Sequence, residues 1–233
     1  MEILHEDNQI IVVKKPQNVP SQADATGDKD MLSMVKEYVK EKYNKPGNVF
    51  IGLVHRLDRP TGGIIVFARN SKSAARLAEQ VQNGTLEKRY MCVVCGIPKE
   101  NSGHLVHYLR KNEKDNIVEI VPQLTEGAKR AELDYRVLET RGNYSLVEVK
   151  LYTGRSHQIR VQMRSIGCPI FGDQKYGGPN MKKANLNLFA TELRFEHPVS
   201  HDKLVFRAYP PEDEAAWKLF NLEQYLNISK IVD

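Results

Sequence analysis

The segment that most constrains this chain is a polar turn held between two apolar runs, at residues 55–63. The turn reads HRLDRPTGG, and the apolar run Ile64-Ile65-Val66-Phe67 follows it. Pro60 biases Arg59 away from helical dihedral angles, and the two glycines at the end of the turn permit a positive φ. The pattern therefore predicts a loop that carries Asp58 just before a buried strand.

Asp58 lies between two guanidinium groups, those of Arg56 and Arg59. Nearby positive charges favour the carboxylate form of an aspartate, and loops on a rigid scaffold are where binding and catalytic residues concentrate. The alternative is that Asp58 forms a surface ion pair that stabilises a hairpin. This segment alone does not distinguish the two interpretations.

The composition is that of a folded, non-membrane domain. Of 233 residues, 41% are apolar and 27% are charged, which excludes a disordered chain. The net charge of +5 suits a nucleic-acid partner without requiring one. The N-terminal segment has early acidic residues and no long apolar run, so we expect no signal peptide and no membrane association. Three cysteines are an odd number, which argues against a disulfide framework and favours the cytoplasm.

Two pairs of residues have a spacing that suggests metal binding. Cys92 and Cys95 form a C-x-x-C pattern, and His104 and His107 are three apart. Both pairs lie in segments that read as strands, where residues three apart point to opposite faces. We therefore expect structural cysteines and no metal site.

The remaining pattern predicts an α+β fold with a mixed, largely antiparallel sheet and flanking helices. Expected strands cover residues 10–13, 63–68, 87–95, 103–110, 116–121, 131–140, 144–153, 185–197 and 204–209. Expected helices begin at Asp30, at Asn70 or Ser71, at Ser156 or His157, and near Pro211. No repeat or linker is evident, so we expect one catalytic domain over residues 1–233.

Two further segments are dense in polar residues between apolar runs. One is Glu87-Lys88-Arg89-Tyr90, at the entry of a predicted strand. The other is the stretch TGRSHQIR at residues 153–160, where a strand turns into a helix. Gly154 allows a tight turn, which places Arg155 just outside a helix N-terminus, a position suited to anions.

Together these segments resemble the motifs of the RluA-type RNA pseudouridine synthases. HRLDRPTGG, EKRY and TGRSHQIR occur in the family's order, followed by GCPIFGD, by Tyr176-Gly177 and by LRFEHP. The resemblance covers about residues 4–209. A lone GRxHQIR would be weak, whereas the set is specific. Gly62 stands where serine is usual, and Gln162 and Phe189 stand where histidine is common, so details of substrate contact can differ from the family.

The resemblance implies isomerisation of specific uridines in structured RNA, either rRNA or tRNA, to pseudouridine after base flipping, without a metal or an organic cofactor. Asp58 would be the catalytic nucleophile and would attack either the ribose or the uracil ring. Tyr90 would stack on the flipped uracil, and Arg155 would pair with Asp58. Arg56 would fill the gap that the flipped base leaves.

The partner implied is RNA, bound by basic residues around the site. His55, Arg59 and Arg160 are expected to contact it, and further phosphate contacts would come from Lys88, Arg89 and Arg164. The family pattern starts within the first dozen residues, where many relatives carry an S4 domain. We therefore expect RNA selection by the catalytic domain itself or by a partner. A monomer is the expected state.

Two other classes of function fit parts of the sequence. A non-catalytic RNA-binding module could retain this fold, although it has no need of a carboxylate at an anionic ligand. A hydrolase or lyase could use Asp58 with His55 or His157 as the acid and base, but the chain has no G-x-S-x-G, H-E-x-x-H or P-loop motif. Taken singly, Tyr90 also reads as a strand tyrosine, and Arg155 as an ion-pair or cap residue.

Overall fold

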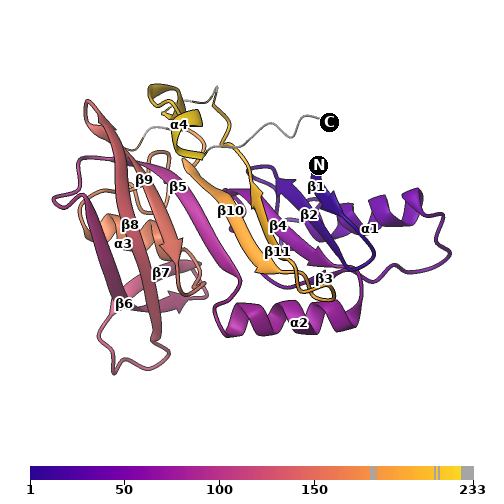
Figure 1. Ribbon diagram of the computed structural model, residues 1–233. Coiled ribbons are helices and arrows are strands. Elements are labelled where there is room, and N and C mark those ends of the chain that lie inside the picture. The colour runs from indigo at the N-terminus through magenta and orange to yellow at the C-terminus, as the bar shows by residue number, and fades with distance from the viewer. Residues whose placement is uncertain (179–180, 182, 213, 215, 227–233) are drawn as a thin grey trace. The chain divides into compact units, whose positions relative to one another are not determined.

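The computed structural model of the protein describes residues 1–178, 181, 183–212, 214 and 216–226 (Figure 1). The chain divides into two compact units. Unit 1 comprises Met1–Glu87 and Glu192–Ala208, and unit 2 comprises Lys88–Thr191 and the residues from Tyr209 onward. The chain returns to unit 1 inside strand β10 (Leu188–Glu196). That residues 1–233 act as one domain stays a prediction.

Unit 1 is built on antiparallel strands with a core that reaches both of their faces. Its strands are β1 (Glu2–Glu6), β2 (Ile10–Lys15), β3 (Gly52–Leu53), β4 (Gly62–Ala68), the end of β10, and β11 (Lys203–Arg207). Strand β2 lies between β1 and β4. All four residues of the run Ile10-Ile11-Val12-Val13 are 0% exposed. Such a run forms a strand that is covered on both sides, as the sequence predicts.

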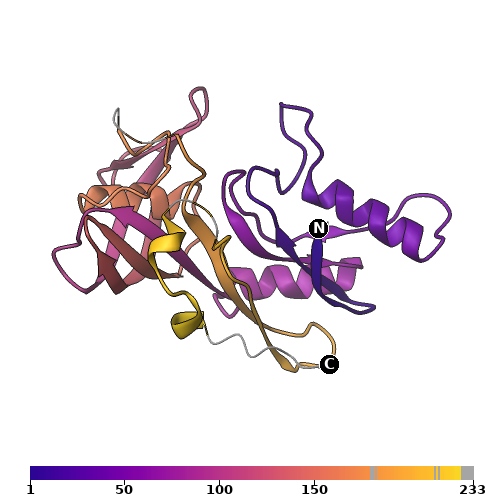
Figure 2. The same cartoon turned by 90° about the horizontal axis from the view of Figure 1, so that it is seen from above.

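Helices α1 (Met31–Lys42) and α2 (Ser71–Gln82) lie on opposite faces of these strands (Figure 2). Val35 and Val39 of α1 join the core cluster that contains Ile11 and Phe67. On the other face α2 comes so close that a Cβ at Gly52 would lie 2.9 Å from that of Ala74. The close approach explains why a glycine stands in β3.

The predicted N-caps of both helices are confirmed. The side chain of Asp30 accepts a hydrogen bond from Ser33 N–H, and the side chain of Asn70 accepts one from Ser73 N–H. Each bond satisfies an amide that the first helical turn leaves without an intrahelical acceptor. Local sequence therefore fixes where both helices start.

Unit 2 contains an antiparallel sheet with one helix packed on it. The strand order is β5-β9-β8-β6-β7. The strands are β5 (Glu87–Cys95), β6 (Ser102–Asn112), β7 (Ile117–Val121), β8 (Lys129–Arg141) and β9 (Tyr144–Leu151). Helix α3 (Gln158–Ser165) packs through Val161 against Ala131 of β8 and Leu109 of β6. The predicted α+β class and the largely antiparallel pairing are confirmed.

Three elements differ from the predictions, and one of them is strand β3, which the predicted strands do not include. The helix expected from Pro211 to Leu222 is instead a 3-10 turn at Trp217–Leu219 and a short helix α4 at Glu223–Leu226, with residues 213 and 215 outside the described part. Trp217 is buried, so packing and not helical periodicity fixes this segment. Strand β1 is not among the predicted elements, because its residues lack a continuous apolar run. No described helix is long and apolar enough to cross a bilayer.

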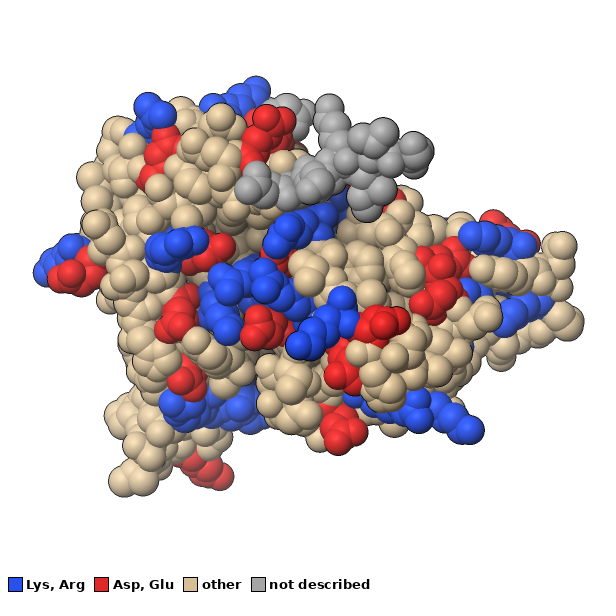
Figure 3. Space-filling model, viewed as in Figure 1, with Lys and Arg blue, Asp and Glu red and all other residues tan. Residues whose placement is uncertain are grey.

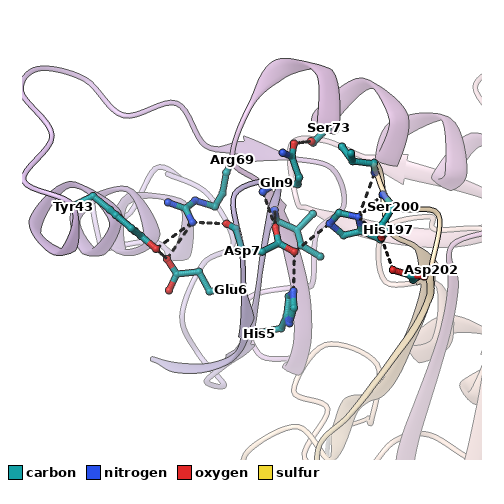
Figure 4. A network of polar contacts seen from close by, with 12 residues as sticks. His5, Glu6, Asp7, Gln9, Tyr43, Arg69, Ser73, His197, Ser200 and Asp202 are labelled. Carbon is teal, nitrogen blue, oxygen red and sulfur yellow. Dashed lines mark hydrogen bonds and ion pairs between the residues drawn. The ribbon is translucent and has the colours of Figure 1, made fainter.

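A polar network around Asp7 ties two hairpins of unit 1 together (Figure 4). Asp7 follows β1, and its Oδ1 accepts hydrogen bonds from the backbone N–H groups of Gln9 and Ile10. Its Oδ2 lies 2.9 Å from Nε2 of His5 and 3.1 Å from Nε2 of His197, which follows β10. Nδ1 of His197 accepts the N–H of Ser200, so Nε2 is the nitrogen that donates to Asp7. One carboxylate thus joins the β1–β2 and β10–β11 turns.

We expect Asp7→Asn to lower the free energy of unfolding by about 1–3 kcal/mol at pH 7, because an amide nitrogen would face two donating rings. Burial alone would raise the pKa of Asp7, but hydrogen bonds from His5, Gln9 and Ile10 outweigh it and hold the pKa below its usual 3.8. The contribution is therefore present above pH 3.8 and is lost as the pH falls through the lower folded value. Urea unfolding from pH 2 to pH 7 measures both effects.

The matched control is Asp115→Asn, at an exposed turn of unit 2 where the carboxylate accepts one bond from Asn112. We expect it to change the free energy of unfolding by less than about 0.5 kcal/mol. A difference between wild type and Asp7→Asn that stays constant down to pH 2 would contradict the role given to the carboxylate.

Candidate active site

Asp58 occupies the turn that the sequence predicts, between β3 and β4. The N–H of Thr61 donates to the carbonyl of Asp58 over 2.9 Å and closes a four-residue turn with Pro60 inside it. Gly63 follows with a φ of 124°, which only glycine adopts without strain. Leu57 is buried and Asp58 is half-buried, so the hydrophobic neighbour anchors the turn and the carboxylate stays partly accessible.

The end of β2 and the segment that follows it hold this turn through side-chain hydrogen bonds to its backbone. The Lys15 ammonium donates to the carbonyl of Arg59 over 3.1 Å, and the Gln17 amide donates to the carbonyl of Pro60 over 3.0 Å. The hydroxyl of Ser21 donates to the Leu57 carbonyl and accepts the Leu57 N–H. Each link joins residues more than 30 positions apart, so tertiary contacts hold the backbone around Asp58.

Lys15 holds the turn that carries Asp58, and the sequence analysis does not single it out. Its side chain is 0% exposed, and its ammonium also donates to the carbonyls of Pro16 and Val19. Three acceptors match the three N–H groups of an ammonium. Burial lowers the pKa of Lys15 to about 7, and the negative charge of Asp58 opposes that shift. The signal in the sequence is a lysine that directly continues the buried run at residues 10–13.

The other predicted contacts of this loop differ in what their side chains do. Nε2 of the buried His55 accepts the N–H of Val66 over 3.2 Å, so this ring supports the start of β4. Arg59 forms an ion pair with Asp28 and lies 3.7 Å from Asp24. Arg56 is exposed. Of these three side chains, that of Arg56 is the most open to a partner.

Strand β5 separates the basic residues of the EKRY motif onto two faces. Lys88 and Tyr90 point to one face and Arg89 to the other, since side chains alternate along a strand. Arg89 lies 3.3 Å from Glu148 of β9, whereas Tyr90 is 5% exposed. The predicted stacking of Tyr90 on a base stays a prediction.

The loop that carries Arg155 is organised by Gln158. Oε1 of this buried amide accepts the N–H of Arg155 over 3.0 Å and the hydroxyl of Thr153 over 2.8 Å. Its Nε2 donates to the carbonyl of Glu132 on β8 over 3.0 Å. The exposed Arg155 is directed by a further bond, from its Nε to the carbonyl of Arg130. The spacing of Arg155 and Gln158 in the motif thus has a direct structural cause.

Helix α3 starts after a residue with a left-handed backbone. His157 has a φ of 52° and offers no side-chain cap, and its Nδ1 lies 2.7 Å from the hydroxyl of Tyr176. Ser156 therefore does not serve as the cap that the sequence suggests. The same Tyr176 hydroxyl accepts the N–H of Val118 on β7. His157 is buried, and its bond to Tyr176 orients the loop.

Arg160 lies inside unit 2 and holds a loop. Its Nε and one terminal nitrogen donate to the two oxygens of Asp173 over 2.8 and 2.7 Å, with side chains 6% and 0% exposed. Asp173 also accepts the N–H groups of Lys175 and Tyr176. Arg160 was expected to contact RNA, yet in this geometry it does not present its guanidinium to solvent.

The predicted site residues are distributed over both units. His55, Arg56, Asp58 and Arg59 belong to unit 1, whereas Tyr90, Arg155 and Arg160 belong to unit 2. In unit 1 the named groups lie on one loop, whereas in unit 2 they lie on β5, on the loop after β9 and in α3. The pairing of Arg155 with Asp58 stays a prediction.

The cysteines and histidines whose spacing suggests metal binding lie in strands and contact other side chains. Cys92 is buried inside β5, and burial raises the pKa of its thiol, which opposes formation of a thiolate ligand. His104 lies beside Glu132 and Asp134 on one face of β6, and His107 contacts Gln162 on the other. Among the described residues, no group of three His, Cys, Asp or Glu side chains could hold a metal ion.

We expect Lys15→Met to destabilise unit 1 by about 1–3 kcal/mol, because three carbonyls lose a charged donor. The pKa of Lys15 falls from 10.5 to about 7 on folding, so between these values the unfolded chain binds a proton that the folded chain does not. Wild-type stability should therefore rise with pH across this window relative to the variant. Urea unfolding between pH 6 and pH 10 tests this, with Lys14→Met as the control. Parallel pH curves for wild type and Lys15→Met would refute it.

Comparison with known proteins gives the same family as the motifs. A family profile described as RNA pseudouridylate synthase matches residues 9–165. The chain is 33% identical over 221 residues to the RNA pseudouridine synthase YlyB of Bacillus subtilis, covering 92% of this chain and 71% of that one. It is also 33% identical over 226 residues to the ribosomal large subunit pseudouridine synthase D of Zymomonas mobilis, covering 91% and 70%.

The fold agrees with this assignment. The structure of human RNA pseudouridylate synthase domain containing 4 superposes with a TM-score of 0.76 at 23% identity, covering 90% of this chain and 88% of that one. At this identity the likeness concerns the fold. The family profile and the identities above 30% carry the assignment itself, and the chain therefore belongs to the RluA-type family of RNA pseudouridine synthases.

Proposed function

We propose that this enzyme converts specific uridines of structured rRNA or tRNA to pseudouridine with Asp58 as the nucleophile. The observation that carries this proposal is the turn at residues 58–61, where a half-buried carboxylate stands on a backbone held by Lys15, Gln17 and Ser21. A nucleophile must be held close to its productive position, and such a turn supplies that rigidity.

The conversion requires a base that has left its helix. Flipping costs a few kcal/mol, least in loops and mismatches, and stacking on an aromatic ring returns about 1–3 kcal/mol. We assign that stacking to Tyr90 and the filling of the vacated position to the exposed Arg56. Asp58 attacks the ribose or the uracil ring, and the bond between C1′ of the ribose and N1 of the ring breaks. The ring turns and C5 bonds to C1′, the bond to Asp58 is released, C5 loses its proton and N1 gains one, so that Asp58 is regenerated. Arg155 supplies positive charge to the same reaction.

Large-subunit rRNA is the first substrate to test. The relative from Zymomonas mobilis is named a ribosomal large subunit pseudouridine synthase, and another from Haemophilus ducreyi with 31% identity has the same name. Transfer RNA is the second substrate class, because the motifs of the chain do not separate the two. We infer a cytoplasmic activity from the odd number of cysteines, which argues against a disulfide framework.

Mapping pseudouridine in total RNA with and without the gene tests this function. The strain that lacks the gene should lose pseudouridine at one or a few positions, and purified protein should restore it. We expect Asp58→Asn to lower the rate more than about a thousandfold while RNA binding persists, since only the nucleophile is lost. Asp115→Asn should keep full activity. Unchanged activity in Asp58→Asn would refute the mechanism. If the wild-type protein binds RNA but converts none, the alternative function of a non-catalytic RNA-binding module would be favoured.

The role of Gln158 gives a second test of the same site. We expect Gln158→Leu to lower kcat/KM by about tenfold or more, because the Arg155 N–H loses its side-chain acceptor and the Glu132 carbonyl loses one of its donors. If Gln158 acts by placing Arg155, the double variant with Arg155→Ala should lose little more than Arg155→Ala alone. Rates of pseudouridine formation for the four proteins measure this coupling, and fully additive losses would argue against it.

A further inference from the structure

Lys88 differs from Arg59, Arg89 and Arg160 of the motifs in having no counter-charge among the described residues. Arg59, Arg89 and Arg160 each lie within ion-pair distance of a carboxylate. Among the residues that the structure describes, the Lys88 ammonium has neither an ion pair nor a hydrogen bond. It is half-buried, and burial lowers its pKa with no neighbouring charge to oppose the shift. A cation in this state lacks the anion that would compensate its lost hydration.

The position of Lys88 links it to the candidate stacking residue. Lys88 and Tyr90 alternate along β5 and are paired with Leu151 and Val149 of β9, so all four side chains share one face of the sheet. Two residues along a strand place their Cα atoms about 6.6 Å apart. This separation suits one group that contacts a base and another that contacts the backbone beside it.

The ammonium also lies against the turn that presents Arg155. A Cβ added at Gly154 would be 3.4 Å from Nζ of Lys88. The Lys88 ammonium therefore lies beside the backbone of the loop that carries Arg155. Glycine at position 154 leaves space beside the ammonium that a side chain would occupy.

On the opposite face of the same sheet, basic side chains form ion pairs with acidic ones. There Glu148 lies within 3.3 Å of both Arg89 and Arg136, and Figure 3 shows basic and acidic side chains mixed over this region. Charges that neutralise one another offer a weak site for an anion. Of the two faces, as far as the structure describes them, that of Lys88 and Tyr90 combines a candidate base-stacking ring with an ammonium that lacks an acid.

We propose that Lys88 binds a phosphate of the RNA backbone next to the nucleotide that Tyr90 receives. This inference rests on the proposed function, because it takes RNA as the ligand. Phosphodiester groups are the anions that RNA presents at each nucleotide, and a lysine binds them as a point charge. The cost of leaving the ammonium uncompensated in the free protein is then recovered on binding.

Binding measurements test the proposal without requiring turnover. The probes are large-subunit rRNA and tRNA transcribed in vitro, titrated at several KCl concentrations with wild type, Lys88→Met, Lys88→Arg and Lys150→Met. Lys150 is the matched control, because it lies on β9 and points to the opposite face. We expect Lys88→Met to weaken binding about tenfold at low salt and to reduce the slope of log K against log salt by about one. Lys88→Arg should keep most of the affinity, and Lys150→Met should resemble wild type.

Stability separates a ligand-binding lysine from a structural one. Since the uncompensated charge costs free energy in the folded state, Lys88→Met should unfold at a higher temperature than wild type at pH 7. This gain should shrink as the pH rises from the lowered folded pKa toward 10.5, where the wild-type lysine is neutral only when folded. A variant that binds RNA more weakly and is more stable is the expected result. A destabilised Lys88→Met would overturn the proposal, because the lysine would then serve the fold.

The outcomes also separate this proposal from the proposed function. A salt slope unchanged in Lys88→Met, or changed equally in Lys150→Met, overturns the assignment of Lys88 even if the enzyme modifies RNA. Binding that depends on Lys88 supports the assignment even if neither RNA is converted. If one RNA is converted, KM should rise about tenfold in Lys88→Met while kcat changes little.

Discussion

Lys15 gives its ammonium N–H groups to three backbone carbonyls inside unit 1, and one of these belongs to Arg59, directly after the candidate nucleophile. A lysine with no exposed surface is stable only when each donor has an acceptor. The three carbonyls satisfy the donors of the lysine, and the lysine in turn fixes the positions of these carbonyls. The position of Asp58 thus depends on a charge that is buried with the core of the unit.

In unit 2, a buried polar side chain likewise holds the backbone of a loop through hydrogen bonds. The buried side-chain amide of Gln158 accepts the N–H of Arg155 and the hydroxyl of Thr153, and it donates to a backbone carbonyl of β8. The buried pair of Arg160 and Asp173 fixes the segment that carries Tyr176, which in turn meets His157. Buried polar groups that are fully bonded specify one geometry, because any rearrangement leaves a donor or an acceptor unsatisfied.

These networks divide the basic residues of the motifs into two kinds. Arg59, Arg89 and Arg160 neutralise carboxylates of the protein itself, whereas Arg56 is exposed and Lys88 has no acid partner among the described residues. A net charge of +5 therefore says little about where RNA binds. The cations that have no acidic partner in the fold are the ones that indicate where an anionic ligand can bind.

The sequence by itself determined most of the strand pattern, the cap at Asp30 and a cap at Asn70 or Ser71, the turn at Asp58 and the family, because each depends on residues close together in the chain or on a short motif. It did not reveal that Lys15 is buried or that Arg160 faces Asp173. Burial and charge pairing depend on distances through space between residues that are many positions apart, and only the tertiary structure sets those distances. For the same reason, the sequence treated Lys88 and Arg89 as equivalent phosphate contacts, whereas the pleat of β5 sends them to opposite faces and gives only Arg89 an acid partner.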